Sequence, residues 1–114
     1  MMTDNIFKKI IDKELPAKFV HEDSVCVAFH DVNPQAPVHV LIIPRKEIPT
    51  HDAVTEGDAE LIGHLHVVAA RLAHQFGLGE GYRIVINCRE RAGQTVPHLH
   101  LHLLGGRDLR WPPG

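Results

Sequence analysis

The amino-acid sequence predicts a single α+β domain, residues 1–114, in which a five-stranded antiparallel sheet is accompanied by two helices. Its 114 residues, 44% of them hydrophobic, suffice for one core of ordinary size and leave no room for a second domain. Five short runs rich in β-branched and aromatic residues alternate with turn residues, and only two stretches have the period of a helix. Strands joined by such short connections favour an antiparallel sheet backed by helices.

Two helices are expected, one near the N-terminus and one in the middle of the chain. Asn5 or Asp4 can cap the first, which Pro16 ends. Thr55 and Asp58 form a capping-box-like start to the second, longer helix. The apolar side chains of both helices repeat at helical spacing: Ile6, Phe7, Ile10 and Ile11, then Leu61, Ile62, Leu65, Val68, Ala69, Leu72 and Phe76.

The five expected strands lie at residues 19–20, 25–29, 38–43, 82–87 and 98–104. Glu22 and Asp23 mark a hairpin turn between the first two, and Pro44 ends the third. Residues 88–97 contain glycine and proline and are expected to form a loop. The tail at residues 105–114 has no helix or strand pattern, which predicts an extended C-terminal arm.

Charge and cysteine content exclude several classes of function. The 12 basic and 14 acidic residues form no Lys/Arg stripe, so neither a nucleic acid polymer nor a membrane is an expected partner. Cys26 and Cys88 form no Cys-x-x-Cys pair, which leaves two buried, reduced thiols as the expectation. Lys8 and Lys9 interrupt the N-terminal apolar patch, which is too short for a signal peptide or membrane span, so we expect a cytoplasmic protein.

Residues 98–104, HLHLHLL, alternate histidine with leucine. Successive side chains on a strand point to opposite faces, so His98, His100 and His102 should share one face while the leucines fill the core. The three histidines cannot easily bind the same zinc ion. The backbone positions of His98 and His102 are about 13 Å apart on a strand, whereas ligand nitrogens lie about 2.1 Å from the metal. A zinc site made by His100 and His102 with His39 or His51 remains an alternative, as does a merely polar sheet face.

A third interpretation of these histidines is nucleophilic catalysis. A neutral imidazole attacks phosphorus well when an acceptor holds one ring nitrogen protonated and the other lone pair points outward. Neighbouring imidazoles supply hydrogen-bond donors to the phosphoryl oxygens, and they disfavour one another's charged forms.

Four segments together resemble the histidine triad superfamily, and within it the Hint branch of nucleoside phosphoramidases. They are AFHDVNPQAPVHVLIIP (28–44), GYRIVIN (81–87), GQTVPHLHLHLLGGR (93–107) and WPPG (111–114). The resemblance covers nearly the whole chain. It implies a homodimer whose subunits join two five-stranded sheets into one of ten strands. It also implies hydrolysis of purine nucleoside phosphoramidates without a metal or other cofactor.

The same resemblance implies the roles of individual residues. His100 matches the nucleophile that takes the nucleotidyl group, His102 the residue that contacts the α-phosphate, and His98 and His39 the pair that supports them. The expected phosphate and leaving-group contacts are Asn87, Gly93 and Thr95. The expected ribose and base contacts are Asp31, Val32, His30, Phe29, Ile6, Phe7 and Ile10. Trp111 corresponds to the C-terminal segment that reaches toward the partner's active site.

Two departures from the family pattern leave the leaving-amine side open. Pro97 stands where many relatives have tyrosine, and CRERA at residues 88–92 replaces a more glycine-rich loop. The resemblance implies that the protein hydrolyses nucleoside phosphoramidates or aminoacyl-adenylates and releases a purine nucleoside monophosphate. The alternatives are a dinucleoside polyphosphate hydrolase of the same superfamily, a nucleotide-binding or scaffold protein with negligible turnover, and a zinc-binding protein.

Overall fold

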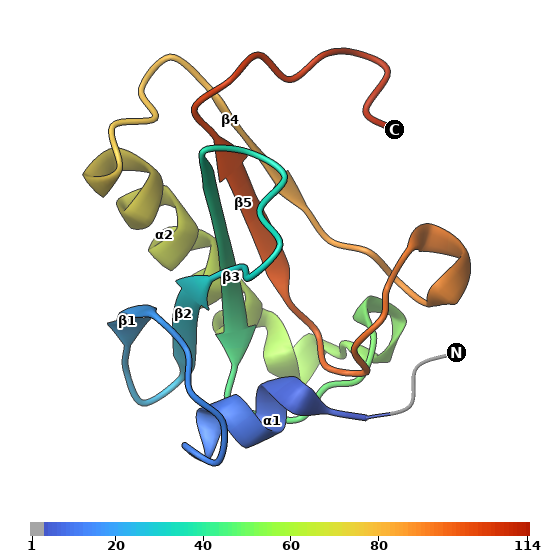
Figure 1. Cartoon of the computed structure of the whole chain (residues 1–114). Coiled ribbons are helices and arrows are strands. Elements are labelled where there is room, and N and C mark those ends of the chain that lie inside the picture. The colour runs from blue at the N-terminus through green and yellow to red at the C-terminus, as the bar shows by residue number, and fades with distance from the viewer. Residues whose placement is uncertain (1–3) are drawn as a thin grey trace.

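A five-stranded antiparallel sheet forms the centre of the fold (Figure 1). The structure, a computed structural model, describes residues 4–114. The strands are β1 (Phe19–Glu22), β2 (Cys26–His30), β3 (Val38–Pro44), β4 (Tyr82–Val85) and β5 (Leu101–Gly105). Their order in the sheet is β1-β2-β3-β5-β4, and every neighbouring pair is antiparallel. The predicted α+β class and strand count are confirmed.

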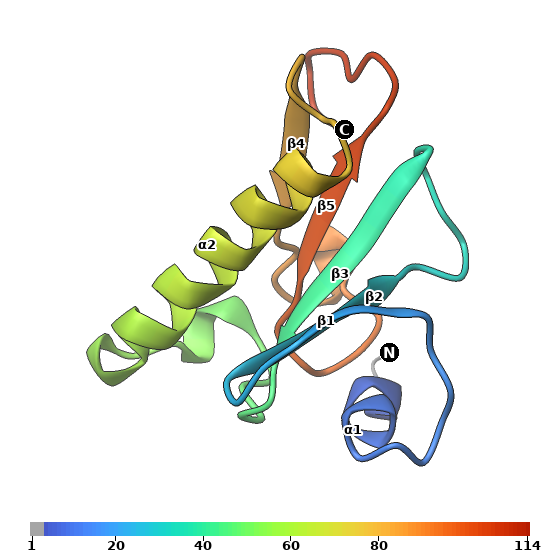
Figure 2. The same ribbon diagram turned by 90° about the vertical axis from the view of Figure 1, so that its left-hand side faces the viewer.

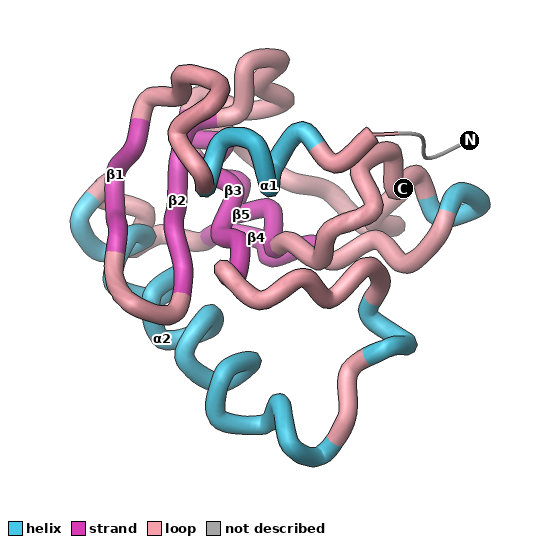
Figure 3. The backbone as a smooth tube through the Cα atoms, turned by 90° about the horizontal axis from the view of Figure 1, so that it is seen from below, coloured by secondary structure: helices cyan, strands magenta, loops and turns pink. Residues whose placement is uncertain are grey.

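The two helices cover opposite faces of this sheet, as Figures 2 and 3 show. Helix α2 (Ala59–Gln75) runs along one face, and the short helix α1 (Ile6–Ile11) lies against the other. Alternate residues of the strands contribute to the two cores that result. Leu99, Leu101 and Leu103 are buried in the core beneath α2, as predicted for the leucines of the triplet.

The core beneath α1 is smaller and partly aromatic. It contains Phe7, Ile10 and Ile11 of the helix together with Phe29 and Leu41 of the sheet. Leu41 pairs with His102 across the β3–β5 ladder, so His102 points toward this face. The histidine-bearing face of β5 is therefore the one that α1 covers.

Both predicted helix caps form, although each helix differs slightly from expectation. The Asn5 side chain accepts a 3.0 Å hydrogen bond from the N–H of Lys8, but α1 ends at Ile11, well before Pro16. Thr55 and Asp58 make a capping box around a 3-10 turn, η2 (Glu56–Asp58), and α2 follows from Ala59.

Two strands are shorter than predicted. β4 ends at Val85, and β5 begins at Leu101, so residues 98–100 precede the strand. A tertiary hydrogen bond explains the late start of β5, because the N–H of Leu99 donates to the carbonyl oxygen of Ile48 at 2.7 Å.

The prediction that both cysteine thiols are buried is wrong for Cys88. Cys88 is only partly buried, whereas Cys26 is buried. No helix in the described part of the chain is both long and apolar enough to cross a membrane.

Candidate active site

The predicted nucleophile, His100, is held in one tautomer by its own chain. Its Nδ1–H donates a 2.7 Å hydrogen bond to the carbonyl oxygen of His98, and a carbonyl can only accept. The Nε2 atom therefore has the free lone pair. Within residues 4–114, every fully buried side-chain nitrogen and oxygen has a hydrogen-bond partner. Nε2 of His100 has none there, so this atom is not fully buried and is in contact with solvent. The edge-on ring of Phe7, 4.9 Å away between centroids, packs against the imidazole.

His98 is fully buried and acts as a support for this segment. Its Nε2–H donates to the carbonyl oxygen of Pro44 at 2.7 Å. Its Nδ1 then accepts from the side-chain amide of Asn5 at 3.0 Å. The backbone that orients His100 is in this way fixed to the end of β3 and to the cap of α1.

His39 and His102 form a second linked pair on the adjacent strands β3 and β5. The backbone N–H of Gln35 donates to Nδ1 of His39 at 3.0 Å, so the His39 proton resides on Nε2. That Nε2–H donates to Nδ1 of His102 at 2.9 Å. In the neutral state, His102 therefore carries its proton on Nε2 and is a donor. Its ring centroid is 4.8 Å from that of His100.

Burial keeps the histidines of this site uncharged. Desolvation is the largest cause that lowers the pKa of His39, His98 and His100 from 6.5. Burial and the adjacent His100 and His39 lower the pKa of His102 to about 4. All four imidazoles are therefore neutral near pH 7, which is the state that nucleophilic attack requires.

Asp31 lies next to His39, at the start of the loop between β2 and β3. One carboxylate oxygen accepts from the N–H of Asn33 at 2.8 Å, and the other lies 3.4 Å from Nε2 of His39. Beside it is an open groove of about 760 Å³, bounded by the segment after α1 and by this loop. Its lining includes Pro16, Lys18, Asp31, Val32 and His39. The groove is large enough for a small-molecule ligand.

The residues predicted to contact the base fall into three groups. Ile6 is 40% exposed and Val32 is fully exposed, as an open apolar slot requires. Phe7, Ile10 and Phe29 belong to the core beneath α1. The ring of His30 packs edge-on against Phe76, next to the C-terminal end of α2, so it points away from His100 although the residue borders the groove.

The predicted phosphate contacts lie on the segment between β4 and β5. Gly93 has a left-handed backbone with φ of 98°, which glycine adopts without strain. Asn87 is half-buried and Thr95 is exposed. Within the described chain no hydrogen bond joins these three residues to the histidines. The segment also contains an unpredicted 3-10 turn, η3 (Glu90–Ala92).

Two supporting residues were missed in the sequence. Gln94 is 3% exposed; its amide donates to the carbonyl oxygens of Pro49 and Val96, and its oxygen accepts from the N–H of Arg89. It therefore fixes the shape of the loop that contains Gly93. Asn5 was expected only as a helix cap, and no local pattern signals its contact with His98 across 93 positions.

The zinc alternative takes a different form from the one expected. Ligand-type atoms of Asp31, His39 and His102 lie within 4.8 Å of one another, whereas no such group in residues 4–114 includes His100 or His51. His51 is exposed in the 3-10 turn η1 (His51–Ala53). A hydrogen bond already joins His39 to His102, and a carboxylate oxygen of Asp31 lies 3.4 Å from Nε2 of His39.

The C-terminal arm leaves the sheet beside β4. Arg83 donates to the carbonyl oxygen of Arg110 at 2.8 Å, which ties the arm to that strand. Trp111 is 82% exposed, so its ring is available to another surface.

Comparison with known proteins identifies relatives along the whole chain. The family model described as the HIT domain matches residues 12–109. An uncharacterized HIT-like protein of Synechocystis is 55% identical over 114 residues, the full length of both chains. The crystal structure of a HIT family hydrolase from Legionella pneumophila is 49% identical, with a TM-score of 0.95 over 97% of this chain and 100% of that one. A histidine triad nucleotide-binding protein from Candida albicans is 29% identical, with a TM-score of 0.82 over 96% of this chain and 83% of that one.

Proposed function

Because the chain belongs to the histidine triad (HIT) family, we propose that it hydrolyses purine nucleoside phosphoramidates through a covalent nucleotidyl-histidine intermediate. The observation that supports this most is the 2.7 Å hydrogen bond from Nδ1–H of His100 to the carbonyl oxygen of His98, which leaves Nε2 unprotonated. The hydrolase name of the Legionella relative and the nucleotide-binding name of the Candida relative agree with this proposal.

The first chemical step is attack by the Nε2 lone pair of His100 on the α-phosphorus. A phosphorus–nitrogen bond to His100 forms and the bond to the leaving amine breaks. The amine departs with the electron pair and takes up a proton from solvent. The imidazole becomes positively charged in this step, and the carbonyl oxygen of His98 accepts its Nδ1–H throughout. The Nε2–H of His102 donates to a phosphoryl oxygen as charge develops there.

Water completes the reaction. It attacks phosphorus and gives up a proton to solvent, and the bond to Nε2 of His100 breaks. A nucleoside monophosphate leaves, and His100 returns to its neutral tautomer. No cofactor takes part. Two displacements with an oriented imidazole replace one slower attack by water.

The substrate lies across the groove next to Asp31. The carboxylate oxygen that faces His39 accepts from the ribose hydroxyls, and the exposed side chains of Ile6 and Val32 flank the purine. Asn87, Gly93 and Thr95 contact the phosphate and the leaving amine. His30 takes part in binding only through its backbone, because its ring packs against Phe76.

The active form is a homodimer in this proposal. β4 is an edge strand, so its outer side can pair with the same strand of a second subunit. The exposed Trp111 next to this edge extends toward the second subunit and contributes to leaving-amine preference.

Steady-state kinetics test this function. The protein should hydrolyse adenosine 5′-phosphoramidate faster than a diadenosine polyphosphate, and a chelator should leave the rate unchanged. His100→Ala should lose at least about 10³-fold in turnover and still bind the nucleotide. His66→Gln, at an exposed position of α2, is the matched control. Preference for the diadenosine compound would favour the polyphosphate hydrolase, and negligible turnover on both would favour a binding protein.

A further inference from the structure

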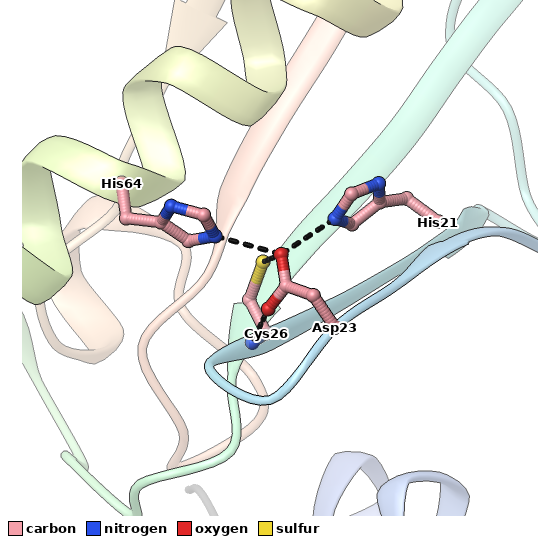
Figure 4. A group of neighbouring side chains, drawn as sticks. All are labelled: His21, Asp23, Cys26 and His64. Carbon is pink, nitrogen blue, oxygen red and sulfur yellow. Dashed lines mark hydrogen bonds and ion pairs between the residues drawn. The ribbon is translucent and has the colours of Figure 1, made fainter.

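Four side chains of metal-binding type meet on the face of the sheet that α2 covers. His21 comes from β1, Asp23 from the turn after it, Cys26 from β2 and His64 from α2 (Figure 4). One ligand atom from each lies within 4.8 Å of all the others. These residues take no part in the reaction proposed above, because His39 and His102 face the other side of the sheet.

Asp23 is the centre of this cluster. Its Oδ2 accepts from Nε2 of His21 at 2.6 Å and from Nε2 of His64 at 2.7 Å, and Sγ of Cys26 lies 3.6 Å away. Its Oδ1 accepts from the backbone N–H groups of Val25 and Cys26. One carboxylate oxygen is thus fixed by the turn, and the other faces the three remaining side chains.

We propose that His21, Asp23, Cys26 and His64 bind one Zn²⁺ ion that joins the β1–β2 hairpin to α2. Imidazole nitrogen, thiolate sulfur and carboxylate oxygen are the usual zinc ligands. One thiolate and one carboxylate carry two negative charges, which neutralise the two positive charges of the ion, and the two imidazoles remain neutral.

The dimensions of the cluster fit a tetrahedral ion. Ligand atoms about 2.0–2.3 Å from zinc lie roughly 3.3–3.8 Å from one another. The separation between Cys26 Sγ and Asp23 Oδ2 already falls in this range. The two contacts between Asp23 and the histidines are shorter, so both imidazoles move outward by about 1 Å, which rotation about their side-chain bonds allows.

The four side chains differ in burial, so the site is shielded from solvent on one side and accessible to it on the other. Cys26 is fully buried, whereas the side chains of His21, Asp23 and His64 are 27%, 26% and 33% exposed. Zinc can therefore arrive from solvent on the histidine side and reach the thiol behind.

Binding changes the protonation of the cluster in a defined way. The thiol of Cys26 loses its proton to solvent as the sulfur–zinc bond forms. Without metal, Nε2 of each histidine is protonated and donates a hydrogen bond to Asp23. When zinc binds at Nε2, that atom loses its proton to water and Nδ1 takes one up. Starting from neutral imidazoles, one proton per ion is released overall.

Metal titration of the full chain tests the site directly. After treatment with a chelator, the protein is titrated with Co²⁺, and the thiolate-to-cobalt charge-transfer band and the d–d bands of tetrahedral cobalt are followed. Zn²⁺ is then added in competition, and native mass spectrometry counts the ions per chain. We expect one ion per chain, the sulfur band with Co²⁺, and a Zn²⁺-dependent rise in Tm.

Variants distinguish this site from the triad. His64→Gln and Cys26→Ser should weaken Zn²⁺ binding by at least about 100-fold, and Cys26→Ser should abolish the sulfur band. His64→Gln leaves the core intact, so it provides the test even if the buried substitution prevents folding. Cys88→Ser, His66→Gln and His102→Gln should bind as the unaltered chain does. Absence of a bound ion, or binding that is lost in His102→Gln and kept in His64→Gln, would overturn the proposal.

Discussion

The Nδ1–H of His100 donates a hydrogen bond of 2.7 Å to the backbone carbonyl oxygen of His98, two residues earlier in the chain. Since that carbonyl cannot donate, the tautomer of His100 is fixed by the backbone itself. The ring of His98 is in turn bound to Pro44 and Asn5, so the orientation of the nucleophile depends on two distant segments.

Replacement of His102 by alanine should lower kcat and change KM much less. In the proposed reaction its Nε2–H stabilises charge that develops on the phosphoryl group, and loss of one such donor costs about 10²–10³-fold in kcat. Kinetics on adenosine 5′-phosphoramidate measure this, with His66→Gln as the control. A variant with unchanged kcat would remove His102 from the chemistry.

Replacement of Asp31 by asparagine should abolish discrimination between ribose and 2′,3′-dideoxyribose. A hydrogen bond to a charged group contributes about 1.5–3 kcal/mol, so the unaltered protein should bind adenosine monophosphate about 10- to 100-fold more tightly than its dideoxy analogue. Asparagine keeps the oxygen that accepts from Asn33, so the turn should persist. Calorimetry measures both affinities. If Asp31→Asn still prefers adenosine monophosphate over the dideoxy analogue as strongly as the unaltered protein does, Asp31 serves only the turn.

Asn5 should stabilise the fold through two separable contacts. Serine at this position keeps the helix cap but cannot also reach Nδ1 of His98, whereas alanine makes neither contact. Asn5→Ser should lower the free energy of unfolding by about 1 kcal/mol or more, because the buried His98 nitrogen loses its donor. Asn5→Ala should lower it by about a further 1 kcal/mol. Urea denaturation measures both, and a serine variant as stable as the unaltered chain would contradict a role for the His98 contact.

Acid should destabilise the protein before its carboxylates are protonated. The pKa of His102 is about 4 in the folded chain, below its ordinary value of 6.5, so the unfolded chain binds more protons between these two values. Its stabilising contribution is therefore complete above pH 6.5 and is lost as the pH falls toward 4. The lowered pKa values of His39, His98 and His100 act in the same direction.

Urea denaturation at about pH 7.5 and at about pH 5 measures this dependence. The free energy of unfolding should be lower at the acidic value, and the difference should be smaller in His102→Gln. Equal differences in the two proteins would show that His102 has an ordinary pKa.

The sheet was predictable from local patterns, whereas the support of the site was not. Alternation of leucine with histidine correctly placed Leu101 and Leu103 in the core, because side chains on a strand alternate between faces. The same alternation wrongly extended the strand back to His98, where hydrogen bonds to Ile48 and Pro44 replace the ladder.

Contacts between distant segments explain what the sequence could not indicate. The cluster of His21, Asp23, Cys26 and His64 combines a hairpin with a helix that follows much later, so no ligand spacing marks it. Cys26 was expected as a buried, reduced thiol, and its burial is confirmed. The position of His64 beside it depends on how α2 packs on the sheet, and helix periodicity alone does not specify that packing.

Mass spectrometry of the protein, quenched shortly after mixing with adenosine 5′-phosphoramidate, detects the covalent intermediate itself. We expect one adenylyl group per chain on the ring of His100, which disappears as substrate is consumed, and no adduct in His100→Ala. Full turnover by His100→Ala, or an adduct on a different residue, would contradict it.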